Sequence, residues 1–147
     1  MLSLEEARDA ILAQVTPAAA TETVSLAQAH GRFTAQALHA QVDNPAFDNS
    51  SMDGYAVRTR DFTEGMATFP VIGRQPAGPK LRNPWPSTPA ALRIFTGAPI
   101  PTDFDAVIMQ ERCTQLGDTV VVARRPTRGE NIRLLGEDVP DGAIILQ

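Results

Sequence analysis

The apolar positions near the N-terminus follow helical spacing. They recur at Leu4, Ala7, Ile11, Leu12 and Val15. Ser3 and Glu6 precede this stripe with the spacing of a capping box, in which each side chain bonds the other's backbone N–H. The pattern predicts an amphipathic helix over residues 4–15, ended by Thr16-Pro17, because the residue before a proline disfavours helical angles.

Residues 16–42 carry weaker signals. Ser25 and Gln28 offer a second capping box, and Gly31 is a helix-stop signal. Residues 32–42 suit a strand better than a helix, because Leu38, Ala40 and Val42 alternate.

From residue 53 onward, short apolar runs are separated by Gly, Pro, Asn and Asp, which is typical of an all-β unit. The runs are residues 55–57, 69–72, 91–95, 106–109, 119–123 and 143–146. Gly117 predicts a hairpin turn within residues 115–119. The proline-rich residues 76–89, which include Pro84, favour an extended loop. Trp85 either pins this loop to the β core or contacts a partner.

A polar run, Phe47 to Arg58, stands at the mouth of the first of these strands, with the sequence FDNSSMDGYAVR. Its Asp, Asn and Ser side chains favour local bonds to backbone over regular structure. Asp53-Gly54 is a turn dipeptide. The run reads either as a rigid loop that presents carboxylates and hydroxyls for chemistry, or as an ordinary Asx-rich turn.

Composition narrows the class of protein. The 147 residues are 43% hydrophobic and 20% charged, typical of a globular domain. No apolar run approaches the roughly 20 residues that span a bilayer, so we expect no membrane contact. The net charge of −4 gives no general attraction to nucleic acid. The single cysteine, Cys113, excludes an internal disulfide and fits a reducing compartment such as the cytoplasm.

Basic residues gather in one stretch, where Glu130 lies among Arg124, Arg125, Arg128 and Arg133. Guanidinium groups bind anions through forked hydrogen bonds. The stretch is therefore either an anion site or a solvated surface strand and loop.

Three blocks resemble one family, in order along residues 44–139. FDNSSMDGYAVR is similar to the signature of the MoeA family, the molybdopterin molybdenumtransferases, with Ser51 where Ala is common. Residues 93–101, RIFTGAPIP, resemble its R-I-x-T-G-A-P-x-P block, and DAVIMQE follows at residues 105–111. Asn131 to Val139 resembles its N-x-R-x-x-G-E-D block.

The resemblance implies an activity. Family enzymes take adenylylated molybdopterin and molybdate and, with Mg²⁺, form molybdenum cofactor and release AMP. Their cleft is completed across a homodimer, from this region of one subunit and a pterin-binding α/β domain of the other. The family enzyme has about four hundred residues in four domains, so the resemblance covers its N-terminal region only. We therefore expect the chain to be part of such an enzyme, a cytoplasmic dimer, and inactive alone.

The blocks also imply site residues. Asp53, Thr96 and Asp138 match acidic or hydroxylic positions of the family cleft. We expect the two Asp residues to share a divalent cation, since hard oxygen ligands suit Mg²⁺, and Gly97 to expose its N–H to an anion. The three matched residues also have structural interpretations: Thr96 as a strand-end Thr that bonds backbone, and Asp53 and Asp138 as Asp residues that cap turns.

Other residues are assigned around these three. We expect substrate binding from Ser50, Ser51 and Gly97, and support from Asp48 and Asn49. Glu111 and Arg133 are expected to be structural ion partners, whereas His30 and His39 match no block and are not metal-ligand candidates. No metal ligand set is assigned.

The expected fold is α+β, mostly β, with short N-terminal helices. A β-rich subdomain, residues 43–137, is inserted in an extended part, residues 1–42 and 138–147. The apolar run at residues 144–146 suggests a cut within a strand, hence a piece of a longer protein. The alternative function is a non-catalytic dimerisation or scaffolding module.

Overall fold

The computed structural model describes residues 2–16, 20–63, 65, 67–79 and 85–147. The chain forms two units, residues 1–38 with 146–147 and residues 39–145. The division falls within two short strands that pair with each other, β1 (Leu38–His39) and β10 (Ile144–Leu146). The domain boundaries expected from the sequence, residues 1–42 with 138–147 and residues 43–137, stay a prediction.

The first unit contains the helix α1 (Leu4–Leu12). Its capping box is confirmed: Ser3 N–H donates to Glu6 Oε2 at 2.7 Å, and Glu6 N–H donates to Ser3 Oγ at 3.1 Å. The expected extension to residue 15 is wrong, because Gln14 and Val15 donate to carbonyls only three residues back. Pro17, expected to end the helix, lies outside the described residues.

The second capping box is not formed. Ser25 Oγ donates to Gln28 Oε1 at 2.9 Å instead of accepting from backbone, and only the single turn η1 (Leu26–Gln28) follows. The strand expected in residues 32–42 reduces to Leu38 and His39 of β1. His39 uses Nδ1 in a 2.8 Å bond with Gly142 O, which is a structural role.

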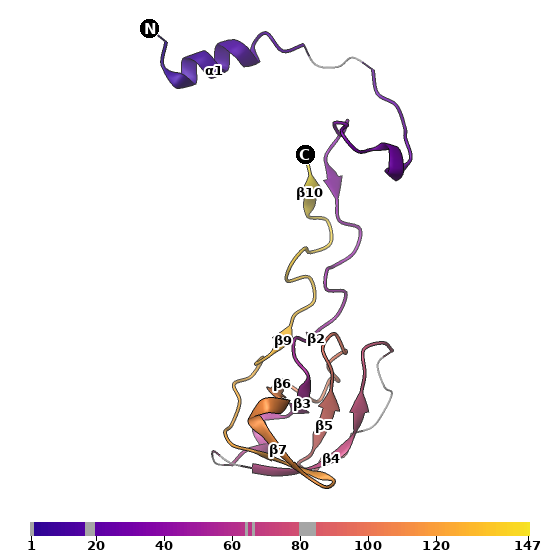
Figure 1. Ribbon diagram of the computed structural model, residues 1–147, viewed down its shortest axis with the longest axis vertical. Coiled ribbons are helices and arrows are strands. Elements are labelled where there is room, and N and C mark those ends of the chain that lie inside the picture. The colour runs from indigo at the N-terminus through magenta and orange to yellow at the C-terminus, as the bar shows by residue number, and fades with distance from the viewer. Residues whose placement is uncertain (1, 17–19, 64, 66, 80–84) are drawn as a thin grey trace. The chain divides into compact units, whose positions relative to one another are not determined.

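The second unit is built on a six-stranded sheet in the order β6-β3-β5-β4-β8-β7 (Figure 1). Every neighbouring pair is antiparallel except β4 with β5. The strands are β3 (Gly54–Val57), β4 (Ala67–Gln75), β5 (Ala91–Ile94), β6 (Ala106–Met109), β7 (Cys113–Leu116) and β8 (Thr119–Val122). The predicted runs therefore became strands, and Gly117, at φ 58°, makes the predicted β7–β8 turn.

The long strand β4 makes the sheet curl. Its first half, residues 67–70, pairs with β8, and its second half pairs with β5. The register shifts between Val71 and Arg74, where Gly73 takes φ 158°. A bulge bends a strand and increases its twist. One strand therefore serves both halves of the sheet, which Figure 1 shows folding over on itself.

Both faces of strand β3, which lies between β6 and β5, are buried, and this explains its unbroken apolar sequence. Tyr55 and Val57 pack in one core cluster with Phe62 and Phe69, and Ala56 packs in the other with Leu92 and Ile94. Gly54 allows β6 to approach, because a Cβ there would lie 2.0 Å from Ile108 O.

The proline-rich segment is pinned to this core. Trp85 packs edge-on against Phe104, with ring centroids 5.7 Å apart, so the core interpretation of Trp85 is confirmed. The buried Arg58 pairs with Asp61 at 2.7 Å and donates to the carbonyls of Pro86 and Thr88. Pro84 and the only lysine, Lys80, lie outside the described residues.

Two short strands that the sequence did not predict join the polar run to the chain beyond the sheet. In β2 (Asn49–Ser50) and β9 (Ile132–Arg133), Asn49 stands opposite Arg133 and Ser50 opposite Ile132. The remaining single turns are η2 (Thr59–Asp61) and η3 (Gln110–Arg112). Each described helix is too short and too polar to span a membrane.

Candidate functional site

The structure brings together two of the three candidate catalytic residues, Asp53 and Thr96. Asp53 precedes β3 and Thr96 follows β5, and these antiparallel strands pair with Gly54 opposite Ile94. Asp53 Oδ1 accepts two hydrogen bonds from Thr96, at 2.8 Å from the backbone N–H and at 2.9 Å from the hydroxyl. These two bonds join the start of β3 to the end of β5.

These contacts stabilise the ionised form of Asp53. The backbone N–H of Thr96 lowers the pKa of the carboxyl most, its hydroxyl lowers it further, burial opposes them, and the charge of Arg93 adds a smaller lowering. The backbone of Asp53 is fixed as well, since Gln110 N–H donates to its carbonyl at 3.0 Å. The site therefore offers an oriented carboxylate, whose Oδ2 has no hydrogen-bond donor among the described residues.

Gly97 lies in the turn beside this pair, and Ser50 of β2 binds that turn. Gly97 takes φ 78°, as a tight turn requires, but its N–H donates to Ser50 O at 2.8 Å. The expectation that Gly97 exposes its N–H is therefore wrong in this conformation, because the turn itself uses that donor. Ser50 is fully buried, and its hydroxyl donates to Met52 O at 2.6 Å. Both residues shape the loop, and their role in substrate binding stays a prediction.

Ser51 is half-buried beside them and is tied to the third block. Its N–H donates to Asn131 O at 3.0 Å. Asn131 has a left-handed backbone, φ 54°, and its side chain donates to Val107 O at 2.8 Å. The contribution of Ser51 to substrate binding also stays a prediction.

Asp138 has other partners. Its carboxylate accepts from Arg133 Nη2, its N–H donates to Asn44 O at 3.1 Å, and Arg133 Nε donates to Glu137 at 3.0 Å. No hydrogen bond joins Asp138 to Asp53 or Thr96 among the described residues. Arg133 is thus the structural ion partner expected, whereas Glu111 accepts only from Gln110 in the described part of the chain.

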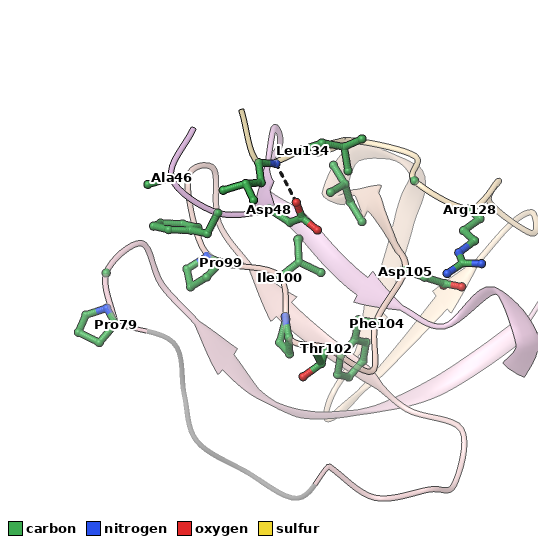
Figure 2. Close-up of a pocket in the computed structure, with 16 residues that line it drawn as sticks. Ala46, Asp48, Pro79, Pro99, Ile100, Thr102, Phe104, Asp105, Arg128 and Leu134 are labelled. Atoms are coloured by element: carbon green, nitrogen blue, oxygen red, sulfur yellow. Dashed lines mark hydrogen bonds between the residues drawn. The ribbon is translucent and has the colours of Figure 1, made fainter. Parts of the chain in front are cut away.

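A cavity in the second unit lies away from Asp53 and Thr96, neither of which lines it. It measures about 740 Å³ and is mostly apolar, with lining that includes Phe47, Ile100, Phe104, Leu134 and Leu135 (Figure 2). Asp48 borders it, with Oδ1 accepting from Leu135 N–H at 2.8 Å, and Arg128 lies on another side with Asp105. Asp48 thus supports the polar run by tying it to the third block, whereas the Asn49 side chain supports it from within, by donating to Phe47 O at 3.2 Å.

The described residues contain no cluster of three or more His, Cys, Asp or Glu side chains arranged for a metal ion. Mg²⁺, however, is usually held by one or two carboxylates together with waters and substrate phosphates. Asp53, ionised and with one oxygen available, fits the role of a single protein ligand in such a site.

Two other candidates are structural. Arg124 forms an ion pair with Glu130. Burial alone would raise the pKa of the Glu130 carboxyl, but hydrogen bonds from Arg124 and Thr127 outweigh burial, so the pKa is lowered. This pairing favours the structural interpretation of the arginine stretch. Burial raises the pKa of the Cys113 thiol to about 11, so the thiol stays protonated and is a poor nucleophile.

Sequence reasoning missed Arg93 and its neighbours. Arg93 donates to Gly54 O at 3.0 Å and to Gln110 Oε1 at 2.5 Å, so it contacts the residue after Asp53 and the residue whose N–H binds the Asp53 carbonyl. Its guanidinium lies 4.7 Å from the centre of the Phe95 ring. The signal was present: alternation around the buried Ile94 places Arg93 and Phe95 on the other face of the strand.

Comparison with known proteins agrees with this arrangement. A family model described as the MoeA N-terminal region, domains I and II, matches residues 2–147. A molybdopterin molybdenumtransferase of Haemophilus influenzae is 42% identical over the whole chain, which covers 36% of that protein. One of Synechococcus elongatus is 36% identical over 99% of the chain, which covers 38% of that protein.

Solved structures give the same result. The crystal structure of a molybdopterin biosynthesis MoeA protein from Pyrococcus horikoshii matches 86% of this chain with a TM-score of 0.79 and 36% identity, over 34% of its own length. The chain thus spans about a third of the proteins it resembles. The mostly-β fold expected from the sequence is confirmed, and the chain belongs to the family of MoeA N-terminal regions.

Proposed function

We propose that this chain is the N-terminal part of a molybdopterin molybdenumtransferase. In the proposed reaction molybdate is inserted into adenylylated molybdopterin, with Mg²⁺, to form molybdenum cofactor and release AMP. The observation that carries the proposal is the Asp53–Thr96 link, since each residue lies in a separate family block and the fold brings the two together.

Asp53 is proposed to hold or orient a bound cation or water near the reacting phosphate. Mg²⁺, when bound, supplies charge neutralisation and polarises phosphoryl oxygens. Thr96 keeps Asp53 ionised and in place through its two hydrogen bonds. Asp138, whose carboxylate Arg133 already holds, is proposed to contribute once the remaining domains complete the cleft.

A chimaera tests this proposal. Residues 2–147 replace the corresponding region of the Haemophilus influenzae relative, and AMP release is measured with adenylylated molybdopterin, molybdate and Mg²⁺. We expect a functional chimaera, and a loss of turnover on the order of 10² or more for Asp53→Asn. Asp118→Asn, in the exposed β7–β8 turn, is the matched control. Normal turnover with Asp53→Asn, or a folded but inactive chimaera, contradicts the proposal.

The 147-residue chain alone is proposed to be inactive, because the relatives' remaining two-thirds lie outside the match. The same AMP assay on the purified chain checks this, and turnover near that of the full-length relative would refute it.

Assembly distinguishes the alternative function, a dimerisation or scaffolding module. The observation that favours it is the apolar stripe of α1, where Leu4 is 82% and Ile11 67% exposed. A homodimer that buries this stripe predicts concentration-dependent light scattering, weakened by Ile11→Asp. A scaffold predicts that a dimer forms while the chimaera stays inactive, whereas the enzyme predicts activity.

A further inference from the structure

A row of aligned side chains crosses the sheet beside the Asp53–Thr96 link. Tyr55 of β3 stands opposite Arg93 of β5, and Arg93 stands opposite Arg74 of β4. Arg93 lies 5.2 Å from the Tyr55 ring centre, and Arg74 lies 5.2 Å from the ring centre of Phe95, which Arg93 also contacts. Two guanidinium groups therefore share one aromatic ring.

This arrangement puts like charges directly across a strand pair. Like charges opposite each other destabilise a sheet, and a ring face offsets this only in part. Neither arginine forms an ion pair with a described residue, and the nearest effect on an acid is the smaller lowering of the Asp53 pKa by the charge of Arg93. An anion that binds between the two removes the repulsion.

The two arginines differ in what they have left to offer. Arg93 is half-buried and uses two of its donors on Gly54 O and Gln110 Oε1. Arg74 is exposed, and its side chain makes no hydrogen bond to a described residue. Its guanidinium instead lies over the ring of Phe95. Arg74 therefore has its planar fork of donors free for a ligand, the geometry that suits phosphate.

The position of the row relates it to the candidate site. Phe95 directly precedes Thr96, whose hydroxyl and N–H hold Asp53. Arg93 contacts the carbonyl of Gly54, which directly follows Asp53. A ligand held by Arg74 over Phe95 thus lies next to the turn that carries the candidate carboxylate.

We propose that Arg74, placed by Phe95 and Arg93, is a binding residue for the anionic oxygens of a phosphate ester. The choice of a nucleotide phosphate as that ester rests on the proposed function. Arg74 supplies charge-assisted hydrogen bonds, Phe95 holds its guanidinium flat, and Arg93 adds charge without releasing its own partners.

Isotope-edited NMR on the purified chain tests the proposal, with AMP as the probe and with inorganic phosphate and adenosine as separate arms. AMP is expected to shift the signals of Arg74 Nε–Hε, Phe95 and Thr96 in a saturable way. Inorganic phosphate should shift the same signals, since the charge is what is recognised. Adenosine, which lacks the phosphate, should not. Shifts by adenosine equal to those by AMP overturn the proposal, because stacking on Phe95 then explains the binding.

Substitutions sharpen this test. Arg74→Gln is expected to weaken AMP binding about three- to tenfold, as for loss of a charged hydrogen-bond donor. Arg74→Lys keeps the positive charge and should therefore bind AMP more tightly than Arg74→Gln, though less tightly than the unchanged chain. Arg128→Gln removes the same charge at the separate cavity and should leave AMP binding unchanged. Unchanged binding in Arg74→Gln, or equal weakening in both Gln variants, overturns the proposal.

The binding test needs no turnover, so its outcome is separate from that of the chimaera. An inactive chimaera with AMP shifts at Arg74 rejects the enzyme function and keeps the anion site. An active chimaera together with unchanged AMP binding in Arg74→Gln keeps the enzyme function and rejects the anion site at Arg74.

Discussion

The N-terminal unit and the β unit have similar kinds of apolar residue but use them differently. In α1 no residue is buried, and its local order comes from the Ser3–Glu6 capping box. In β3 every residue is buried, and the strand is paired with β5 on one side and β6 on the other, which come from distant parts of the chain. Isolated helices shorter than about 12–15 residues are marginal in water. The comparison shows that the order of the helix rests on local signals, whereas the sheet contains its own core.

Two arginine–aspartate pairs give the largest expected contrast. Arg58 and its partner Asp61 are 2% and 8% exposed, whereas Arg8 and Asp9 are 64% and 65% exposed. Arg58→Met leaves a buried carboxylate and two carbonyls without their donor, so we expect a loss of about 3–5 kcal/mol in unfolding free energy. Arg8→Met should change it by less than about 1 kcal/mol. Urea denaturation measures both, and equal effects would break the comparison.

A pair of isoleucines tests the apolar side of the comparison. Ile94 is fully buried in β5, and Ile11 is 67% exposed in α1. Ile94→Ala should cost about 2–5 kcal/mol in unfolding free energy, because it removes transfer energy and leaves a cavity. Ile11→Ala should stay within about 0.5 kcal/mol at low protein concentration. A large effect of Ile11→Ala would show that α1 is packed on the folded chain.

Two glycines separate close packing from mere turn geometry within the β unit. A Cβ at Gly54 would meet Ile108 O at 2.0 Å, while one at Gly65 meets nothing within 4 Å. Gly54→Ala must push β6 away from β3, which we expect to cost about 1–3 kcal/mol. Gly65→Ala should be neutral or slightly stabilising. Thermal unfolding of both variants checks this, and a neutral Gly54→Ala would mean that the strands separate freely.

The smallest effect concerns pH. The pKa of Asp53 is lowered in the folded chain, so its bonds to Thr96 contribute stability above the ordinary carboxyl pKa of about 3.9. That contribution is lost as the pH falls through the lower folded-state pKa. Unfolding midpoints measured from pH 6 to pH 3 should therefore drop more steeply for the wild-type chain than for Asp53→Asn. Parallel curves would show that Asp53 is not stabilised as an anion.

Much of this architecture follows from local sequence. The capping box at Ser3, the Gly117 turn and the apolar runs of the sheet involve neighbours in the chain, so their physical causes are visible in a short window. The polar run from Phe47 to Arg58 likewise marked the loop that carries Asp53. The prediction of a second capping box was wrong, because the local sequence allows more than one bond: the Ser25 hydroxyl donates to the side chain of Gln28 rather than accepting from backbone.

Only the tertiary structure decided which polar groups meet. Asp53 and Thr96 are 43 residues apart, and the β3–β5 register makes them partners, while Asp138 pairs with Arg133 instead. The same register aligns Tyr55, Arg93 and Arg74, a row that no local pattern contains. Likewise, the N–H of Gly97 donates to the carbonyl of Ser50, a residue distant in the sequence that only the folded chain brings beside it. Sequence patterns determine the face on which a side chain stands, but strand pairing determines what lies opposite it.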